Sequence, residues 1–161
     1  MLVGIMADSH DNVPAIDNAV QVFNEAGVEM VIHARDFVAP FSLRPLANLK
    51  CPWIGIFGNN DGERKGLTQA SQGRIQPAPY SLNIDGKKTL VVHDLDTVNE
   101  DEWAKNGTQI VIYAHSHLAK IDQKESLLRI NPGELGGWLN QHKTVAILDT
   151  QSLVARVVDI E

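Results

Sequence analysis

Residues 2–10 read Leu-Val-Gly-Ile-Met-Ala-Asp-Ser-His, an apolar run that ends abruptly in three polar side chains. The length and flanks of the apolar part predict a buried β-strand over Leu2–Ala7. Asp8, Ser9 and His10 then lie just beyond the carboxyl end of this strand. The same order, a short apolar run followed by polar side chains, returns several times along the chain.

The first 60 residues alternate between strand and helix patterns. After the first strand we expect a helix that is capped by Asn12, has Pro14 in its first turn and ends at Gly27. The elements expected next are a strand at 29–33, a short helix at 42–49 with Pro45 in its first turn, and a strand at 53–57. This β-α-β-α-β order predicts a parallel sheet that is covered by helices.

The rest of the chain is dominated by strand patterns. Residues 61–79 are rich in Gly, Gln and Pro, and we expect a mobile loop with a single helical turn. Asp85-Gly86 predicts a hairpin turn, and Thr97-Val-Asn-Glu100 is a capping box for a helix that ends near Gly107. Further strands are expected at 80–84, 87–92, 109–113, 118–123, 126–131, 143–149 and 152–159. Two packed sheets with helices outside would accommodate both halves within one domain, residues 1–161.

Composition narrows the class of protein. With 43% apolar and 21% charged residues, the chain can build one ordinary globular core. Its single cysteine, Cys51, excludes an intrachain disulfide framework and favours the cytoplasm. No apolar run is long enough to span a membrane, and the N-terminus lacks the basic start of a signal peptide. The net charge of -6 argues against nucleic acids as partners and leaves a small anionic substrate open.

Five polar clusters follow expected strands: Asp8-Ser9-His10, Asp36, Gly58-Asn59-Asn60-Asp61, His93 and His115-Ser116-His117. Ligand sites of α/β sheets gather at the carboxyl ends of strands. Alternating residues of an extended backbone face one side, so the Asp-x-His and His-x-His pairs could each direct two ligands to one place. Imidazole with carboxylate and amide oxygens suits Mn, Fe, Zn or Ni better than Ca. The predicted metal ligands are Asp8, His10, Asp36, Asn59, His93, His115 and His117, a set that fits two ions roughly 3.5–4 Å apart.

Each of these residues alone has an ordinary structural explanation. Asp8 could cap a turn, His10 could lie on the surface, and His93 could be a hydrogen-bonded core histidine. Their shared position after strands favours the metal site. Two histidines fall outside the pattern: His33 could orient a ligand, although we favour a structural role for it, and we expect His142 to lie on the surface.

The order of these motifs resembles the calcineurin-like metallophosphoesterase superfamily. Three stretches look like its small prokaryotic phosphodiesterase branch, and they read Val-Ile-His-x-x-Asp-Phe, Gly-Asn-Asn-Asp-Gly and Ile-Asn-Pro-Gly-Glu. The likeness runs from Leu2 to about Ile160. It implies an α/β fold, a four-layer α/β/β/α sandwich of two mixed sheets flanked by helices. It also implies an enzyme that hydrolyses small phosphodiesters through a metal-bridging hydroxide, and it favours a homodimer.

The resemblance also implies a role for each ligand. Asp8, His10 and His117 would hold a first ion, while Asn59, His93 and His115 would hold a second, with Asp36 bridging both. Both cofactors would be divalent metal ions, with manganese favoured and nickel, iron, zinc or magnesium as alternatives.

Residue 60 stands where many relatives carry a histidine that donates a proton to the leaving group. Asn60 cannot act as a general acid near neutral pH, but it can bind substrate through hydrogen bonds to a phosphoryl oxygen. The site should therefore favour good leaving groups, and diesters over monoesters. The next residue, Asp61, matches a position that orients the site, so Asn60 and Asp61 are the predicted catalytic residues.

Three positions depart from the family pattern, because relatives usually have Gly where this chain has Arg35, Asp94 and Ala114. A left-handed backbone at Arg35 would cost about 1–2 kcal/mol. Arg35 could repel the metal ions, or it could bind substrate as a fork for phosphate. We expect Arg35 and Asp94 to form an ion pair at the rim of the site. If they are instead independent changes in a weakened enzyme, the chain could be a binding or scaffold module, as in the retromer subunit of this superfamily.

Overall fold

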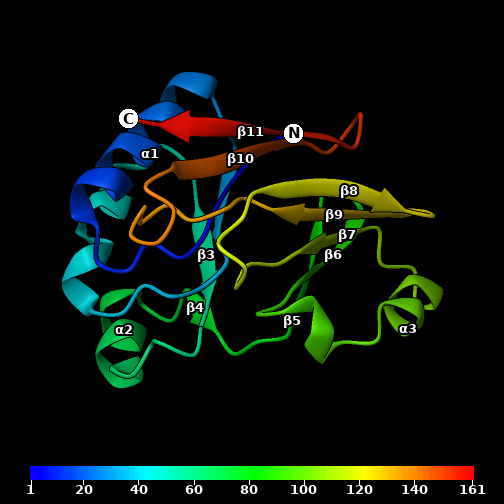
Figure 1. Cartoon of the computed structure of the whole chain (residues 1–161), viewed down its shortest axis with the longest axis horizontal. Coiled ribbons are helices and arrows are strands. Elements are labelled where there is room, and N and C mark those ends of the chain that lie inside the picture. The colour runs from blue at the N-terminus through cyan, green and yellow to red at the C-terminus, as the bar shows by residue number, and fades with distance from the viewer.

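The computed structural model describes residues 1–161, apart from the side chains of residues 97 and 100, and contains two β-sheets packed against each other (Figure 1). The six strands of the first sheet are β1 (Leu2–Met6), β2 (Met30–His33), β3 (Trp53–Ile56), β4 (Ile75–Gln76), β10 (Lys143–Asp149) and β11 (Val154–Ile160). The five strands of the second are β5 (Tyr80–Ile84), β6 (Lys87–Val91), β7 (Ile110–Ile112), β8 (Lys120–Lys124) and β9 (Leu127–Asn131).

Both sheets are mixed, as the resemblance implies. The first sheet has the order β11-β10-β1-β2-β3-β4, in which β1 to β4 run parallel and β10 and β11 are antiparallel. The second has the order β5-β6-β7-β9-β8, with a parallel centre and antiparallel strands at both edges. The carboxyl ends of the parallel strands in each sheet therefore lie along one edge of that sheet.

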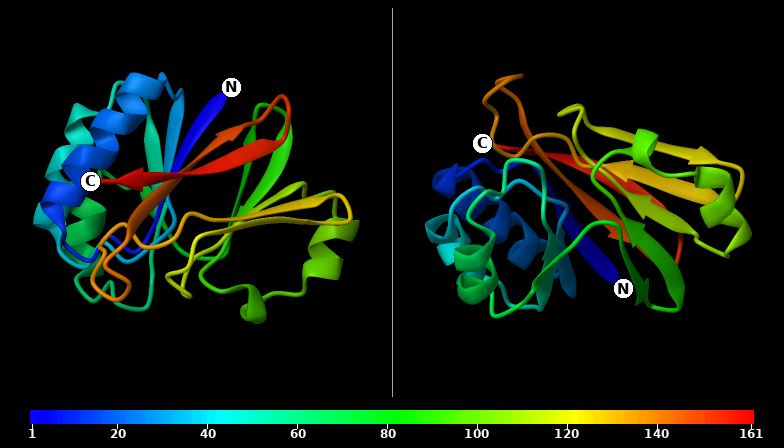
Figure 2. Two further views of the ribbon diagram at one scale, coloured as in Figure 1. Left: turned by 45° about the horizontal axis from the view of Figure 1, so that its top comes forward. Right: turned by 90° about the horizontal axis from the view of Figure 1, so that it is seen from below.

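Helices cover the outer face of each sheet, which gives four layers (Figure 2). The helix α1 (Val13–Ala26), the 3-10 helix η1 (Pro40–Asn48) and the helix α2 (Arg64–Ala70) pack on the first sheet. The short 3-10 helix η2 (Leu95–Thr97) and the helix α3 (Glu100–Lys105) lie beside the second. Among the described residues, no helix is long and apolar enough to cross a membrane.

Strand β1 shows how the sequence places the two cores. Val3 and Ile5 point into the core between the sheets, whereas Met6 packs in the core beneath the helices. This follows from the two-residue period of a strand. Gly4 is needed for close packing, because a Cβ there would lie 2.8 Å from the Phe23 ring of α1. Each apolar side chain buried in these cores contributes about 1.5–3 kcal/mol to folding.

Most of the predicted strands are confirmed, with boundaries that shift by one or two residues, and so is the first helix. The Asn12 side chain accepts a hydrogen bond from the Ala15 amide at 3.2 Å, and Gly27 ends α1 with φ 68°. Asp85 and Gly86 have φ of 50° and 78°, as a hairpin turn of this kind requires. Sequence therefore located the elements that frame the two sheets.

The prediction for residues 61–79 is wrong, because this segment holds α2 and the two-residue strand β4, which pairs with β3. Leu67 is the one residue of α2 that is buried. The sequence of α2 therefore has no repeated apolar residues at helical spacing from which the helix could be predicted. The predicted helix at 42–49 is a 3-10 helix that begins at Pro40 and contains Pro45. Proline lacks an N–H and its ring clashes with the carbonyl four residues before it in an α-helix, so Pro45 disfavours a regular α-helix there.

The helix expected after residue 97 begins later than predicted. Its cap is Asn99, whose side chain accepts from the Glu102 amide at 3.3 Å. The two side chains of the predicted capping box, those of residues 97 and 100, lie outside the described part of the structure.

Candidate metal centre

All five predicted clusters meet at the carboxyl ends of β1, β2, β3, β6 and β7. Their side chains divide into two groups on either side of Asp36. We call Asp8, His10 and His117 the first half-site, and Asn59, His93 and His115 the second half-site.

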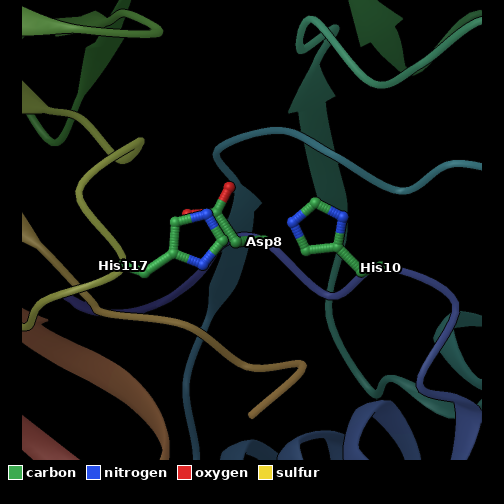
Figure 3. A group of neighbouring side chains, drawn as sticks. All are labelled: Asp8, His10 and His117. Carbon is green, nitrogen blue, oxygen red and sulfur yellow. The ribbon is translucent and has the colours of Figure 1, made fainter. Parts of the chain in front are cut away.

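The first half-site is arranged to receive a cation. One ligand atom from each of its three residues lies within 4.8 Å of the others. The His10 and His117 rings stack with centroids 5.5 Å apart, and Figure 3 shows both beside Asp8, although they come from different loops. Two histidines and a carboxylate suit a divalent transition metal.

Several buried atoms of the first half-site lack a hydrogen bond, although Asp8 Oδ1 lies 3.3 Å from Arg35 Nε and His117 Nδ1 lies 3.4 Å from Glu134 Oε2. Among the side chains that the structure describes, both carboxylate oxygens of Asp8, Nε2 of His10 and Nδ1 of His117 have no hydrogen bond. Buried polar groups in native proteins are normally hydrogen-bonded or bound to a metal. The donor atoms of this half-site therefore fit the metal that the sequence predicts.

The ligand loops have a strained backbone. Left-handed φ values of 50°, 41° and 59° occur at Asp8, His10 and His117, and His115 has φ 76°. Such conformations cost about 1–3 kcal/mol each in non-glycine residues and gather at functional sites. We predicted an extended backbone for Asp8-Ser9-His10 and for His115-Ser116-His117, and this prediction is wrong. His115 and His117 consequently face different half-sites.

Asp36 lies between the half-sites. Its Oδ1 accepts from the Asn60 amide at 3.1 Å, and its Oδ2 accepts from Asn60 Nδ2 at 3.0 Å and from Arg35 Nη2. Its Oδ2 is also 3.9 Å from His10 Nε2. Burial opposes ionisation, but these hydrogen bonds hold the pKa of Asp36 below its usual range. Gly58 permits this arrangement, because a Cβ there would lie 1.8 Å from Asp36 Oδ1.

The second half-site is occupied by the side chain of Arg35. Its Nη1 lies 2.6 Å from His93 Nε2 and 3.5 Å from His115 Nδ1. Its Nη2 donates to Asp36 and, at 2.5 Å, to Asn59 Oδ1. Arginine can only donate, so the facing nitrogen atoms of both histidines must be acceptors. Burial and the Arg35 charge lower the pKa of His93, which agrees with a neutral ring.

This arrangement leaves no place for a second cation beside Arg35. The atoms that the resemblance assigns to the second ion already accept hydrogen bonds from the guanidinium. The second half-site therefore does not fit a metal ion in this structure.

The predicted location of Arg35 at the rim is wrong, because its side chain is 1% exposed. Asp94 Oδ2 lies 3.9 Å from His115 Nε2, so Asp94 and Arg35 contact opposite nitrogen atoms of one ring. The backbone of Asp94 is extended, with φ -142°, so a side chain causes no strain there. Arg35 has φ 116°, which confirms the strain expected where relatives have Gly.

Comparison with known proteins identifies the family of this chain. A model of the calcineurin-like phosphoesterase superfamily domain matches residues 1–153. The chain belongs to this superfamily. A phosphodiesterase of Methanocaldococcus jannaschii is 36% identical over 166 residues, which cover 100% of both chains.

Solved structures of this superfamily share the fold. One, described as a novel archaeal phosphodiesterase, is 36% identical, has a TM-score of 0.91, and is matched over 99% of this chain and 100% of that chain. Yfce, a phosphoesterase from E. coli, is 16% identical with a TM-score of 0.69 over 100% of both chains, and it supports the fold alone.

Burial changes the ionisation of the first half-site of this phosphoesterase. It raises the pKa of Asp8 to about 6, against the opposing charges of Arg35 and His117, and it lowers the pKa of His10. Burial thus favours the neutral form of both groups. A bound cation would favour the ionised carboxylate and the neutral imidazole.

Two buried residues hold the ligand loops in place. Asp61 accepts from the amides of Val38 and Gly58 at 2.8 and 2.7 Å, so it links the loops after β2 and β3. His33 Nε2 lies 2.9 Å from Ser9 Oγ, and its ring stacks on Phe37. The structure thus places His33 directly beneath the Asp8–His10 loop. His142 is exposed, as predicted, and lies 2.8 Å from Asp159.

Sequence reasoning missed Glu134, which is fully buried beside the first half-site. Its Oε2 lies 3.4 Å from His117 Nδ1, and its Oε1 accepts from the Trp138 amide at 2.8 Å. The signal was an acidic residue inside the Asn-Pro-Gly-Glu stretch that follows β9. Glu134 also borders a pocket of about 300 Å³, together with His10, Asn60, His117, Trp138 and Leu139.

Proposed function

We propose that this protein is a phosphodiesterase that uses a divalent metal ion held by Asp8, His10 and His117. The observation that carries the proposal is the set of buried ligand atoms without a hydrogen bond on these three residues, which lie close together. The full-length similarity to a phosphodiesterase supports the choice of reaction. The proposed ion is manganese, with nickel, iron, zinc or magnesium as alternatives that the same donors accept.

A divalent ion bound there supplies Lewis acidity, which activates water and neutralises charge on the phosphoryl group. The protein would position the substrate around it. Asn60 is exposed. One N–H of its Nδ2 donates a hydrogen bond to Asp36, and the other N–H can donate to a substrate. We propose that this N–H binds a phosphoryl oxygen, and that Asp61 acts as a positioning residue through the backbone amides it holds.

Arg35 is proposed to act by charge and not by direct contact with substrate. Its Nη atoms are already bound to Asp36, Asn59 and His93, so the fork expected to grip phosphate is engaged inside the protein. A buried positive charge next to Asp36 still favours a negatively charged ester at the site.

The pocket beside the first half-site is proposed to receive one organic group of the diester. Trp138 and Leu139 give it an apolar wall, and both are largely exposed. This organic group is the one that stays on phosphorus when the leaving group departs, and a monoester has no such group. Together with the absence of a strong acid at Asn60, this favours diesters with good leaving groups.

Other parts of the proposal rest on the sequence. The net charge of -6 favours small diesters over nucleic acids, and the single cysteine favours the cytoplasm. The family resemblance favours a homodimer, and we propose that residues 1–161 act as one domain.

The test is metal-dependent turnover. The purified protein would be stripped of metal, reloaded with Mn²⁺ and assayed on a chromogenic phosphodiester and the matching monoester. We expect turnover of the diester that requires Mn²⁺ and is lost in Asp8→Ala. His142→Ala, which changes an exposed histidine, is the matched control and should keep full activity. Mn²⁺ binding without turnover of either ester would contradict the proposal.

A binding or scaffold module is the second candidate. The observation that favours it is the Arg35 guanidinium, which closes the second half-site. This candidate predicts bound metal and no hydrolysis, so the same assay separates the two.

A further inference from the structure

We propose that the Arg35 guanidinium replaces the second metal ion, so that the centre holds one divalent ion and one fixed organic cation. The inference rests on the proposed function only for its catalytic meaning, because the number of bound ions can be measured without turnover. The sequence alone had predicted two ions.

The contacts of Arg35 carry the proposal. They include all four side chains assigned to the second ion: Asp36, Asn59, His93 and His115. A metal ion and a guanidinium cannot use the same lone pairs. The guanidinium therefore lies where the ligands of a second ion converge.

Charge gives a second, independent argument. Arginine remains protonated in proteins, so the half-site carries a permanent positive charge. Arg35 is 1% exposed, and its Nε is also 3.3 Å from Asp8 Oδ1, so water does not screen this charge from either carboxylate. A divalent ion in the second half-site would meet strong repulsion at short range. Arg35 reaches the first half-site through its ion pair with Asp8, and among the described side chains it makes no hydrogen bond to His10 Nε2 or His117 Nδ1.

The backbone shows that the contacts of Arg35 outweigh a local strain. At φ 116°, a residue with a Cβ is disfavoured. Such a conformation persists when surrounding contacts determine it. Here the surrounding contacts are the hydrogen bonds from the Arg35 side chain to the loops after β2, β3 and β6.

The experiment counts bound ions with Mn²⁺ alone as the probe. Native mass spectrometry gives the stoichiometry, and electron paramagnetic resonance detects the exchange coupling of two neighbouring Mn²⁺ ions. We expect one ion with an uncoupled signal in the wild type, and two ions with a coupled signal in Arg35→Gly. Adding His93→Ala to Arg35→Gly should return the count to one. Arg44→Gly, which removes an exposed arginine, should bind as the wild type does.

The outcomes separate this inference from the proposed function. Two coupled ions in the wild type would show that Arg35 moves aside, and would overturn the inference alone. One ion in both the wild type and Arg35→Gly would also overturn it, since the second half-site would then not be a cation site. No bound ion in any variant would overturn both. Circular dichroism would establish that each variant is folded before its ions are counted.

Discussion

The two half-sites consist of similar residue types, yet of the two, in the described part of the structure, only the first has buried ligand atoms without a hydrogen bond. These atoms belong to Asp8, His10 and His117, whereas the acceptors of the second half-site bind one arginine. A complete ligand set in the sequence therefore does not determine which acceptors stay open to a metal. In the second half-site the side chain of Arg35, the residue next to Asp36, competes for the same lone pairs.

The largest expected effect comes from Asp36→Ala, which breaks the link between the half-sites. It leaves the buried Arg35 charge without its closest carboxylate, and such a loss typically destabilises a protein by about 3–5 kcal/mol. Urea unfolding would measure the change. Removing Arg35 as well, in Asp36→Ala with Arg35→Gly, should recover part of the stability because the buried arginine charge is removed together with its closest carboxylate.

Asp17→Ala is the control for this prediction, since Asp17 is exposed on α1. It should alter stability by less than about 0.5 kcal/mol. If Asp36→Ala behaves like Asp17→Ala, the buried ion pair does not hold the two half-sites together.

His117→Ala and His115→Ala test the comparison most directly. These residues are two positions apart, but they face different half-sites. Removing a residue that orients a metal ligand typically weakens metal binding by about 10–100-fold. Removing a ligand itself should weaken it at least as much, so we expect the Mn²⁺ affinity of His117→Ala to fall by about 10–100-fold or more. His115→Ala should leave the affinity unchanged. Isothermal titration calorimetry would measure both, and equal losses would mean that the ion lies between the half-sites.

The sequence predicted which residues gather, and the family resemblance predicted their division into two sets, but neither predicted that the Arg35 side chain occupies the second set. Asp8, Asp36 and His93 each follow a strand, and the edge at which parallel strands end is fixed by topology, so their convergence could be predicted. The path of the Arg35 side chain could not, because it depends on acceptors from three other loops and on a φ of 116°. Glu134 was missed for a similar reason: its partners are backbone amides that only the folded loop brings near.

Asn60→His tests whether the residue between the two half-sites can act as a general acid. Asn60 donates to Asp36 and borders the pocket, so a histidine there could protonate a leaving group. General acids contribute 10²–10⁴-fold in optimised sites, and we expect a gain of about 10-fold for an alkyl ester with a poor leaving group. Rates on nitrophenyl esters should change little, because these leave without protonation. Equal effects on both substrates would contradict this role.

The smallest expected effect concerns the wall of the pocket next to the first half-site. Trp138 is 63% exposed, and its Nε1 donates to the His10 carbonyl at 3.1 Å. If its ring covers one organic group of the diester, Trp138→Ala loses a contact of about 0.5–1.5 kcal/mol, and KM for an aryl diester should rise about 3-fold. A methyl diester, which has no ring to cover, should show no change. Trp138→Phe keeps an aromatic ring but loses the indole N–H. It therefore separates packing against the substrate from the hydrogen bond to the His10 carbonyl. A rise in KM for both diesters, with Trp138→Phe as impaired as Trp138→Ala, would mean that the indole supports the first half-site and does not contact substrate.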